Sequence, residues 1–310
     1  MRIAVIGAGG VGGYFGGKLA LAGEDVTFIA RGSHLDAMKR DGLRVLSGNG
    51  DFVVPQVKAT DDASTVGPVV LVMIAVKLWS TDESIATARA LMGPESTVVS
   101  FQNGVDAEDK LIAEFGHDRV IGGVANIAAL IESPGVVRHN GTMALLQIGE
   151  LDGRRSARID AIEAACKRAN VDVRVADDIL KSIWEKFVFL ASLSAMTALT
   201  RMPIGPLRED ADTRALFRQL ADEVVDVGRA KGVPLGDGTV DAMLARLDSL
   251  PGSMVASMQG DLLRGNRLEL PWLSGGVVRL GESLGVATPA HRFVFAALKL
   301  YANGRPAEAR

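Results

Sequence analysis

The sequence predicts an α/β domain followed by an all-helical domain, and three observations support this division. In the N-terminal part of the chain, short apolar runs alternate with helical patterns, which is typical of a parallel sheet covered by helices. From residue 178 onward no strand pattern recurs, and apolar residues follow a helical period. The chain of 310 residues is also longer than a single hydrophobic core usually supports. We therefore expect two domains, residues 1–176 and residues 177–310.

The N-terminal segment predicts a strand, a tight turn and a helix. Residues 1–6 are apolar and rich in β-branched side chains, as in a buried parallel strand, and a helical pattern covers residues 11–21. Between them, Gly7, Gly9 and Gly12 have the spacing G-x-G-x-x-G of dinucleotide-binding loops. There the first glycine permits the turn, the second lets the backbone approach a pyrophosphate, and the third lets the helix pack on the strand. We expect the pyrophosphate on the loop formed by Gly7, Ala8, Gly9, Gly10, Val11 and Gly12.

A second predicted strand, residues 25–30, favours a Rossmann-type dinucleotide-binding domain over a glycine-rich surface loop. A NAD-selective domain would place an acidic residue at the end of this strand, where it binds the ribose 2′-OH. This chain has Arg31 there, and a guanidinium matches a 2′-phosphate. We therefore predict NADP(H) as the cofactor. The alternative is that Arg31 is an ordinary solvated arginine.

The rest of the N-terminal domain continues the alternation of strand and helix. The sequence predicts, in order, a helix capped by Ser33 and ended by Gly42, a β-hairpin of residues 43–47 and 51–55, a strand at 69–76, a helix at 84–92 and a strand at 97–101. Residues 120–149 predict short β segments, including 136–139 and 144–148, with turns at Pro134-Gly135 and Asn140-Gly141. A helix at 154–170 and a strand at 171–175 complete the domain.

Polar residues follow two of these strands at the point where each strand ends. Lys77 follows the strand at 69–76, and Asn103 follows the strand at 97–101. Ligands of doubly wound sheets bind beyond the carboxyl ends of the strands, so both residues should lie on the same rim as the glycine loop and Arg31. Taken singly, Lys77 could be an exposed lysine and Asn103-Gly104 a simple turn; their shared position at successive strand ends favours a ligand site.

The C-terminal domain is predicted to contain only helices. We expect them at residues 178–199, 213–231, 238–250, 271–284 and 288–301, with Gly232, Gly252 and Gly285 at helix ends. Lys186 is followed by four apolar residues, which indicates a position beside a buried face. A partly desolvated lysine has a lowered pKa and can donate a proton near neutral pH. The alternative, which periodicity alone favours, is a lysine at the wet edge of an amphipathic helix.

Composition narrows the classes of ligand. The net charge of −3 gives no electrostatic reason to expect nucleic acid or a membrane surface as a partner. Cys166 is the only cysteine and the four histidines lie far apart, so we expect no disulfide and no metal site. No continuous apolar run is long enough to span a bilayer, and the N-terminus enters a strand directly, so we expect a cytoplasmic protein. The sequence does not determine the oligomeric state, and a homodimer is one alternative.

Together these residues resemble the ketopantoate reductases, also called 2-dehydropantoate 2-reductases. The resemblance extends over nearly the whole chain, in order and with matching spacing. It rests on the glycine motif, Arg31, Val76-Lys77, Asn103-Gly104, Trp184-x-Lys186, and the segment from Ser257-Met258 through Asp261 to Glu269. It implies an N-terminal Rossmann domain that binds NADPH and a helical domain that completes the site. It further implies reduction of a 2-oxo acid to a 2-hydroxy acid, as in the conversion of ketopantoate to pantoate in pantothenate biosynthesis.

The resemblance also assigns roles to individual residues. Lys186 resembles the proton donor to the substrate ketone, and Asn103 a contact to both cofactor and substrate. Ser257 resembles a substrate contact and Glu269 a carboxylate near the cofactor. Further cofactor contacts are implied at Arg31, Lys77 and Ala128. From the residues alone, Ser257 could be an ordinary helix residue, and Glu269 could favour a helix start with Pro271 at its first position.

Three positions depart from the family pattern. Where the family usually has asparagines that contact the substrate, this chain has Leu190, Ser194 and Ile204. We therefore expect a more apolar substrate pocket and a substrate that need not be ketopantoate. Two alternatives remain open: a β-hydroxyacid dehydrogenase-like enzyme, which also uses a helix lysine, and a non-enzymatic NADP-sensing protein, which needs no Lys186.

Overall fold

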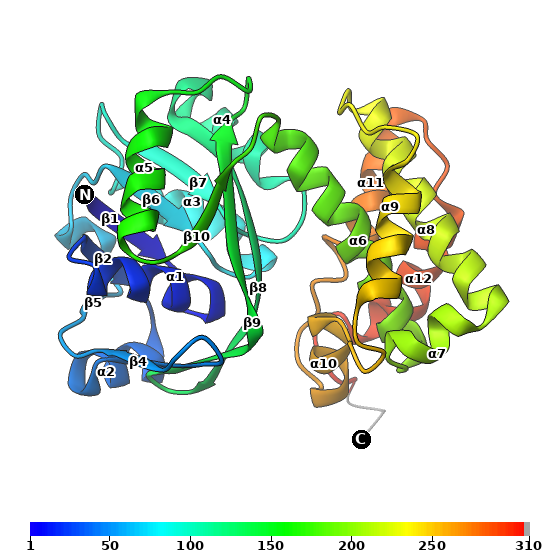
Figure 1. Cartoon of the computed structure of the whole chain (residues 1–310), viewed down its shortest axis with the longest axis horizontal. Coiled ribbons are helices and arrows are strands. Elements are labelled where there is room, and N and C mark those ends of the chain that lie inside the picture. Colours follow the sequence, from blue (N-terminus) through cyan, green and yellow to red (C-terminus); the bar gives the residue numbers. More distant parts are fainter. Residues whose placement is uncertain (307–310) are drawn as a thin grey trace. The chain divides into compact units, whose positions relative to one another are not determined.

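The computed structural model describes residues 1–306, and the chain divides into two compact units, Met1–Ser182 and Ile183–Arg310. The first unit combines a sheet with helices and the second is built of helices, which confirms the predicted fold class (Figure 1). The expected boundary after residue 176 falls just before helix α6 (Ile179–Thr200), whereas the division into units falls inside that helix.

Within the described residues, the first unit holds one sheet of ten strands in the order β4-β3-β9-β8-β7-β6-β1-β2-β5, with β10 paired to β9. The neighbours β7, β6, β1 and β2 are all parallel, so their carboxyl ends meet at one edge. The strands are β1 (Arg2–Ile6), β2 (Asp25–Ile29), β3 (Leu43–Ser47), β4 (Phe52–Val54), β5 (Lys58–Thr60), β6 (Leu71–Ile74), β7 (Thr97–Ser100), β8 (Val120–Ser133), β9 (Val136–Glu150) and β10 (Asp172–Val175).

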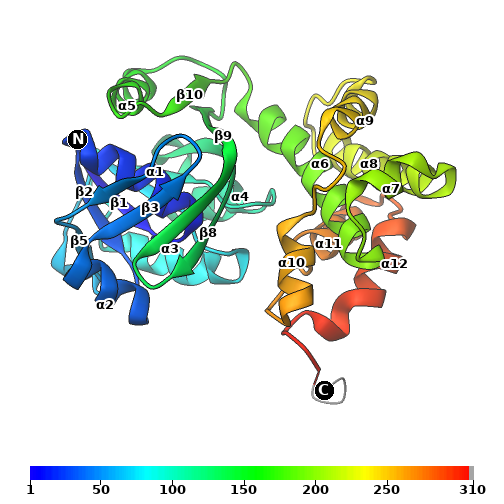
Figure 2. The same ribbon diagram turned by 60° about the horizontal axis from the view of Figure 1, so that its bottom comes forward.

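Helices cover both faces of this sheet. Helices α1 (Gly10–Leu21), α2 (Gly32–Asp41) and α5 (Ala157–Arg168) share one apolar cluster with the sheet, to which Phe15 and Ile159 belong. Helices α3 (Thr81–Arg89) and α4 (Ala107–Phe115) lie on the other face (Figure 2). A second apolar cluster on that face includes Ile85 of α3 and Leu111 of α4. Short 3₁₀ helices lie at Ala63–Thr65, Leu78–Ser80, His117–Arg119 and, in the second unit, Lys299–Tyr301. The result is the three-layer arrangement that the alternating pattern predicts.

The predicted N-cap of α2 is wrong by two residues. Arg31, not Ser33, is the capping residue, and Ser33 lies inside the first turn. Gly32 has φ +55°, a left-handed conformation that glycine adopts without strain. The chain therefore turns from β2 into α2 before it reaches Ser33. The predicted end at Gly42 is confirmed, with φ +82°.

The short β segments expected between residues 120 and 149 are instead one long hairpin of β8 and β9. The turn at Pro134-Gly135 is confirmed, but the expected turn at Asn140-Gly141 lies within β9. Ala129 pairs with His139 while Ile127 pairs with Ala144, so β9 bulges away from β8 at this point. Gly141, with φ +77°, permits this bulge, and pairing resumes beyond it. The two halves of β9 then pair with different strands, β3 and β10.

Several short elements were not expected from the sequence. They are β5 and α4 in the first unit, and α7 (Ile204–Glu209) and α10 (Ser257–Arg264) in the second. β5 pairs with one strand, β2, and has the sequence Lys-Ala-Thr. Three residues with a single apolar side chain are too few to show the alternation that predicts a strand. The strand expected at 69–76 is shorter in the structure: β6 spans Leu71–Ile74, and Val70 before it has 47% of its surface exposed.

The second unit packs around helix α8. Besides α6, α7 and α10, it contains α8 (Ala211–Ala230), α9 (Thr239–Ser249), α11 (Ser274–Leu284) and α12 (Pro289–Leu298). Helix α8 packs against α7, α9, α11 and α12. The Glu223 carboxylate of α8 accepts hydrogen bonds from the backbone N–H groups of Ala290 and His291, at 2.7 and 2.9 Å, and so caps α12. The expectation that Pro271 opens a helix is wrong: Pro271 lies in a turn, and α11 begins at Ser274.

Helix α6 is long and apolar on average, although charged residues such as Lys181 and Lys186 interrupt its sequence. Among the described residues it is one helix of 22 residues that is long and apolar enough to cross a bilayer. However, 72% of its most apolar window is buried inside the protein. Such burial is the property of a core helix of a globular protein, since a membrane-spanning helix turns its apolar surface to lipid.

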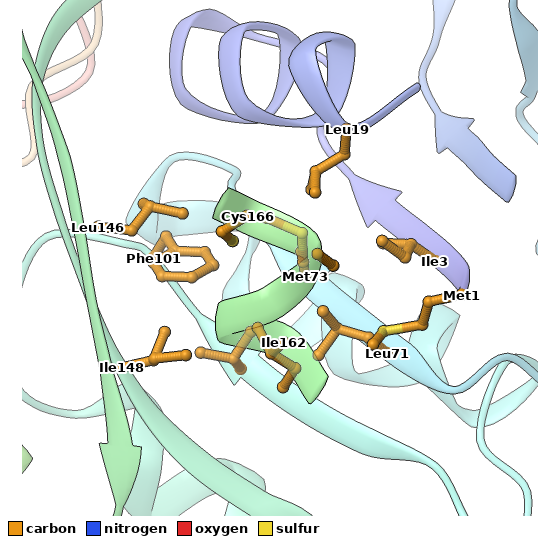
Figure 3. A pocket seen from close by; sticks show the side chains of 12 residues that line it. Met1, Ile3, Leu19, Leu71, Met73, Phe101, Leu146, Ile148, Ile162 and Cys166 are labelled. Carbon is orange, nitrogen blue, oxygen red and sulfur yellow. The ribbon is translucent and has the colours of Figure 1, made fainter. Parts of the chain in front are cut away.

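A small apolar cavity lies between the sheet and α5 in the first unit (Figure 3). Its walls are side chains such as Met73, Phe101, Leu146 and Ile162, together with the thiol of Cys166. Burial raises the pKa of Cys166 to about 12, so the thiol stays protonated and unreactive near neutral pH. A cavity lined by apolar side chains is a packing gap and not a binding site, because it offers water or a ligand too few polar partners.

Candidate functional site

The predicted cofactor residues of the first unit gather at one edge of the sheet. Gly7 follows β1, Arg31 follows β2, Lys77 follows β6 and Asn103 lies just beyond β7. These four strands are adjacent and parallel, so their ends form a continuous rim. Ligands of open α/β sheets bind at such a rim.

The glycine loop has the geometry that each predicted role requires. Gly7 has φ +97°, which only glycine adopts readily. A Cβ at Gly12 would lie 2.0 Å from the Gly7 carbonyl oxygen, so any side chain would push α1 off the strand. A Cβ at Gly10 would lie 2.2 Å from the Ala129 carbonyl oxygen of β8. A Cβ at Gly9 would meet no atom within 4 Å, which leaves this backbone open to a pyrophosphate.

We expect Gly12→Ala to destabilise the first unit. Overpacking of this kind typically costs about 1–3 kcal/mol, so thermal unfolding should show a lower Tm. Gly9→Ala is the matched control: its φ is −73°, which alanine also adopts, and it has room for a methyl group. That variant should keep the wild-type Tm. A Gly12→Ala protein that unfolds at the wild-type temperature would contradict the close packing of α1 on β1.

Hydrogen bonds of the Gln102 side chain connect the end of β7, near Asn103, to the segment that carries Lys77. The Gln102 side chain donates a hydrogen bond of 2.9 Å to Thr81 Oγ1 and a longer one, 3.4 Å, to the Lys77 carbonyl oxygen. The Lys77 ammonium lies 5.7 Å from the centre of the Trp79 ring. Lys77 is exposed and Asn103 is half-buried, so both can reach a ligand on the rim.

Arg31 has a partner that the sequence did not reveal. Its Nη1 lies 2.7 Å from Glu83 Oε1, and both side chains are more than half exposed, at 62% and 54%. Glu83 belongs to the first turn of α3, where a carboxylate is favoured by the helix dipole. No acidic residue follows β2 directly in the sequence, but the fold brings Glu83 there from another helix.

Ala128 lies close to the same loop. It is exposed and sits at the register shift of β8, next to Ala129, whose carbonyl oxygen faces Gly10. The hairpin therefore forms one wall beside the glycine loop. The cofactor contact that the resemblance implies for Ala128 stays a prediction.

In the second unit, the helix that carries Lys186, α6, is anchored by a buried aromatic cluster. Trp184, two residues earlier, is 2% exposed and meets Phe187 edge-to-face at 5.8 Å. Gly228 of α8 makes room for it, since a Cβ there would lie 2.7 Å from the indole ring. Because residues two apart on a helix point in different directions, anchoring Trp184 turns Lys186 away from this cluster. Lys186 itself is half-buried.

Burial lowers the pKa of Lys186 to about 8, from 10.5. The charge of Glu269 opposes this shift, and the charge of Arg246 on α9 adds to it. Glu269 is 5% exposed and lies between α10 and α11. The fold thus brings the predicted proton donor and the predicted carboxylate into electrostatic contact. An amine with a pKa near 8 exists largely as ammonium at neutral pH but gives up its proton readily, as a general acid must.

The other predicted substrate residues differ in accessibility. Ser257 is exposed and is the first residue of α10. Leu190 is half-buried and lies one turn beyond Lys186 on the same face of α6. Ser194 and Ile204 are completely buried, so neither side chain meets solvent. Among the described residues, no group of three or more His, Cys, Asp or Glu side chains could hold a metal ion.

Comparison with known proteins identifies the family. The family model ketopantoate reductase PanE/ApbA matches residues 3–153, and the model of its C-terminal part matches residues 178–302. The 2-dehydropantoate 2-reductase of Mesorhizobium japonicum is 31% identical over 98% of this chain and 99% of its own length. The crystal structure of the 2-dehydropantoate 2-reductase from Geobacter metallireducens GS-15 has a TM-score of 0.88 and 33% identity, covering 96% of this chain and 99% of that one.

The fold is also shared by a more distant enzyme. D-mandelate dehydrogenase, solved with NADH and anilino(oxo)acetate, has a TM-score of 0.88 over 97% of this chain and 98% of its own. At 20% sequence identity, this similarity shows a shared fold and nothing more. The family models, in contrast, match both units of the chain and confirm the resemblance noted in the sequence. The chain therefore belongs to the ketopantoate reductase family of oxidoreductases.

Proposed function

We propose that this protein reduces a 2-oxo acid to a 2-hydroxy acid with NADPH. The observation that supports this proposal most directly is the half-buried Lys186, whose pKa is lowered to about 8. It lies in the part of the chain that matches the C-terminal model of an oxidoreductase family. The rim of the first unit fits a dinucleotide, since Gly9 leaves its backbone open and α1 begins at the next residue. When bound, a reduced nicotinamide supplies the hydride.

The residues of the chain bind the cofactor and the substrate, stabilise the developing charge and supply the proton. The glycine loop binds the pyrophosphate through backbone N–H groups, and Arg31 binds the 2′-phosphate. As hydride adds to the carbonyl carbon, negative charge develops on the carbonyl oxygen. The Lys186 ammonium stabilises this charge and transfers its proton to the oxygen, which completes the 2-hydroxy acid. The resemblance implies substrate contacts for Asn103 and Ser257, and the charge of Glu269 raises the pKa of Lys186 against the effect of burial.

The proposed setting is the cytoplasm, with a small 2-oxo acid as the partner and no nucleic acid or membrane. The two other interpretations make different predictions in a simple assay. A non-enzymatic NADP sensor would bind NADPH but oxidise it with no 2-oxo acid. A β-hydroxyacid dehydrogenase-like enzyme would turn over 3-oxo or 3-hydroxy acids in preference to 2-oxo acids. NADPH consumption with a panel of these acids therefore tests the proposal.

Within that panel, we expect apolar 2-oxo acids to be reduced at least as well as ketopantoate. Leu190 lies one turn from Lys186, so a substrate that reaches the ammonium meets an alkyl side chain where the family usually has an amide. An apolar wall distinguishes substrates by only about 1–3 kcal/mol per methylene, so several branched or aromatic acids should have similar kcat/KM. Ketopantoate turned over at about 10⁵ M⁻¹s⁻¹ or faster, far ahead of every apolar acid, would contradict this. The reaction would then be the pantoate-forming step of pantothenate biosynthesis.

A further inference from the structure

His34 joins three segments that are far apart in the sequence. It lies in the first turn of α2 and is half-buried. Its Nε2 is 2.8 Å from the Ala8 carbonyl oxygen in the glycine loop. Its Nδ1 is 3.0 Å from the backbone nitrogen of Gly135, at the turn between β8 and β9. One imidazole ring thus connects α2, the glycine loop and the hairpin beside it.

These two partners determine the protonation of the ring. The Gly135 N–H can only donate, so Nδ1 must accept and carries no hydrogen. The Ala8 carbonyl oxygen can only accept, so Nε2 must carry the hydrogen and donate it. His34 is therefore a neutral imidazole in a single tautomer. Protonation of Nδ1 would set two N–H groups against each other and break the contact with Gly135.

The bond to Ala8 also orients the next peptide group. In a trans peptide the C=O of Ala8 and the N–H of Gly9 point in opposite directions. Holding the Ala8 oxygen on His34 therefore directs the Gly9 N–H away from His34. A Cβ at Gly9 would meet no atom within 4 Å, so there is free space on the side where a side chain would point. Backbone N–H groups at the start of a helix are donors of the kind that bind phosphate, and α1 begins at Gly10.

We propose that neutral His34 is a positioning residue of the dinucleotide site, which fixes the Ala8–Gly9 peptide so that the Gly9 N–H faces the pyrophosphate. This rests on the proposed use of NADPH. It also makes cofactor affinity sensitive to acid. Burial lowers the pKa of His34, so at neutral pH the ring is neutral and the loop is held. As the pH falls below the ordinary histidine range, protonation of His34 releases it.

The pKa of His34 is lowered by burial, and the hydrogen bond to Ala8 opposes this shift. On β5, which packs against α2, Lys58 is paired with Asp25. On α2 the side chains one turn away are Arg31, which is paired with Glu83, and the apolar Ala37 and Met38. On the hairpin, Glu132 is paired with Arg138. The glycine loop contains no charged residue. The acid response of the loop should therefore follow His34 itself.

Two substitutions separate the bonds of His34. In His34→Gln the amide nitrogen can reach the position of Nε2 and keep the bond to Ala8. In His34→Asn the shorter amide can replace Nδ1 and keep the bond to Gly135 but cannot reach Ala8. His117→Gln is the control, since His117 is exposed on a 3₁₀ helix of the same unit. The measurements are the Kd values of NADPH and of adenosine 2′-phosphate, which lacks the pyrophosphate.

We expect His34→Asn to bind NADPH about 3- to 10-fold more weakly, the effect of one lost hydrogen bond, and adenosine 2′-phosphate as well as the wild type. His34→Gln and His117→Gln should match the wild type at about pH 8. On acidification to about pH 5.5, the wild type should lose NADPH affinity relative to His34→Gln, which has no ring to protonate. Equal NADPH affinity in all variants, or a loss that adenosine 2′-phosphate shares, would overturn the proposal. A wild type that binds no NADPH would instead refute the proposed function.

Discussion

Replacing Lys186 with methionine should lower kcat by about 10²–10⁴, the usual effect of losing a general acid. Methionine keeps most of the length of the side chain but can neither carry charge nor donate a proton. The alkoxide that forms during hydride transfer would then have no positive partner and no proton source from this residue. Because Lys186 belongs to the helical unit and the glycine loop does not, the Kd for NADPH should stay close to that of the wild type.

The control for this substitution is Lys181→Met on the same helix. Lys181 is half-buried like Lys186 but lies five positions earlier, on a different face of α6. That variant should keep its kcat. Single-turnover measurements isolate the chemical step from product release. A Lys186→Met enzyme that retains more than about half of the wild-type rate in that step would remove Lys186 from the mechanism.

The pH dependence gives an independent test of the same group. The acid form of Lys186 is the one that donates, and its pKa in the folded protein is about 8. The rate of reduction should therefore be constant below that pH and fall as the pH rises above it, approaching tenfold per pH unit. Glu269→Gln removes the negative charge that raises this pKa, so the falling limb should move to lower pH. A limb that does not move in this variant would show that another group controls it.

The sequence predicts the parts of the site that depend on local structure. The turn at Gly7, the strand ends at Lys77 and Asn103, and the helix that carries Lys186 all follow from patterns within a short stretch of chain. The long hairpin was missed because the sequence signals at Asn140-Gly141 are the same for a turn and for a bulge. Only pairing with β8 on both sides of Gly141 decides between them.

Contacts between distant segments account for what the sequence could not reveal. His34 meets Ala8 and Gly135 only because α2 packs beside both the glycine loop and the hairpin. Glu83 meets Arg31 only because β6 and β2 flank β1, which places the start of α3 near the end of β2. Neither pair has a spacing that a motif could capture. The site therefore contains polar residues that local sequence patterns do not identify.

Cofactor choice should depend on Arg31 and Glu83 together. Arg31→Ala should raise the KM for NADPH relative to that for NADH by about 10- to 100-fold, since hydrogen bonds to charged groups contribute about 1.5–3 kcal/mol. The pair with Glu83 does not prevent this role. Exposed ion pairs contribute only about 0–1 kcal/mol, so a 2′-phosphate can displace the carboxylate from the guanidinium. Arg31→Lys, which keeps the charge but not the fork of donors, should lie between the wild type and Arg31→Ala.

Glu83→Gln should have the opposite effect to Arg31→Ala. Once displaced, the carboxylate stays close to a phosphate that carries up to two negative charges. At about 5 Å in water their repulsion is roughly 1–2 kcal/mol before screening by salt. Removing it should lower the KM for NADPH about 2- to 10-fold relative to NADH, with a smaller gain at high ionic strength. If Glu83→Gln instead lowered the preference for NADPH, Glu83 would be holding Arg31 in its binding orientation. If neither substitution changed the ratio of the two KM values, the 2′-phosphate would not bind at the end of β2.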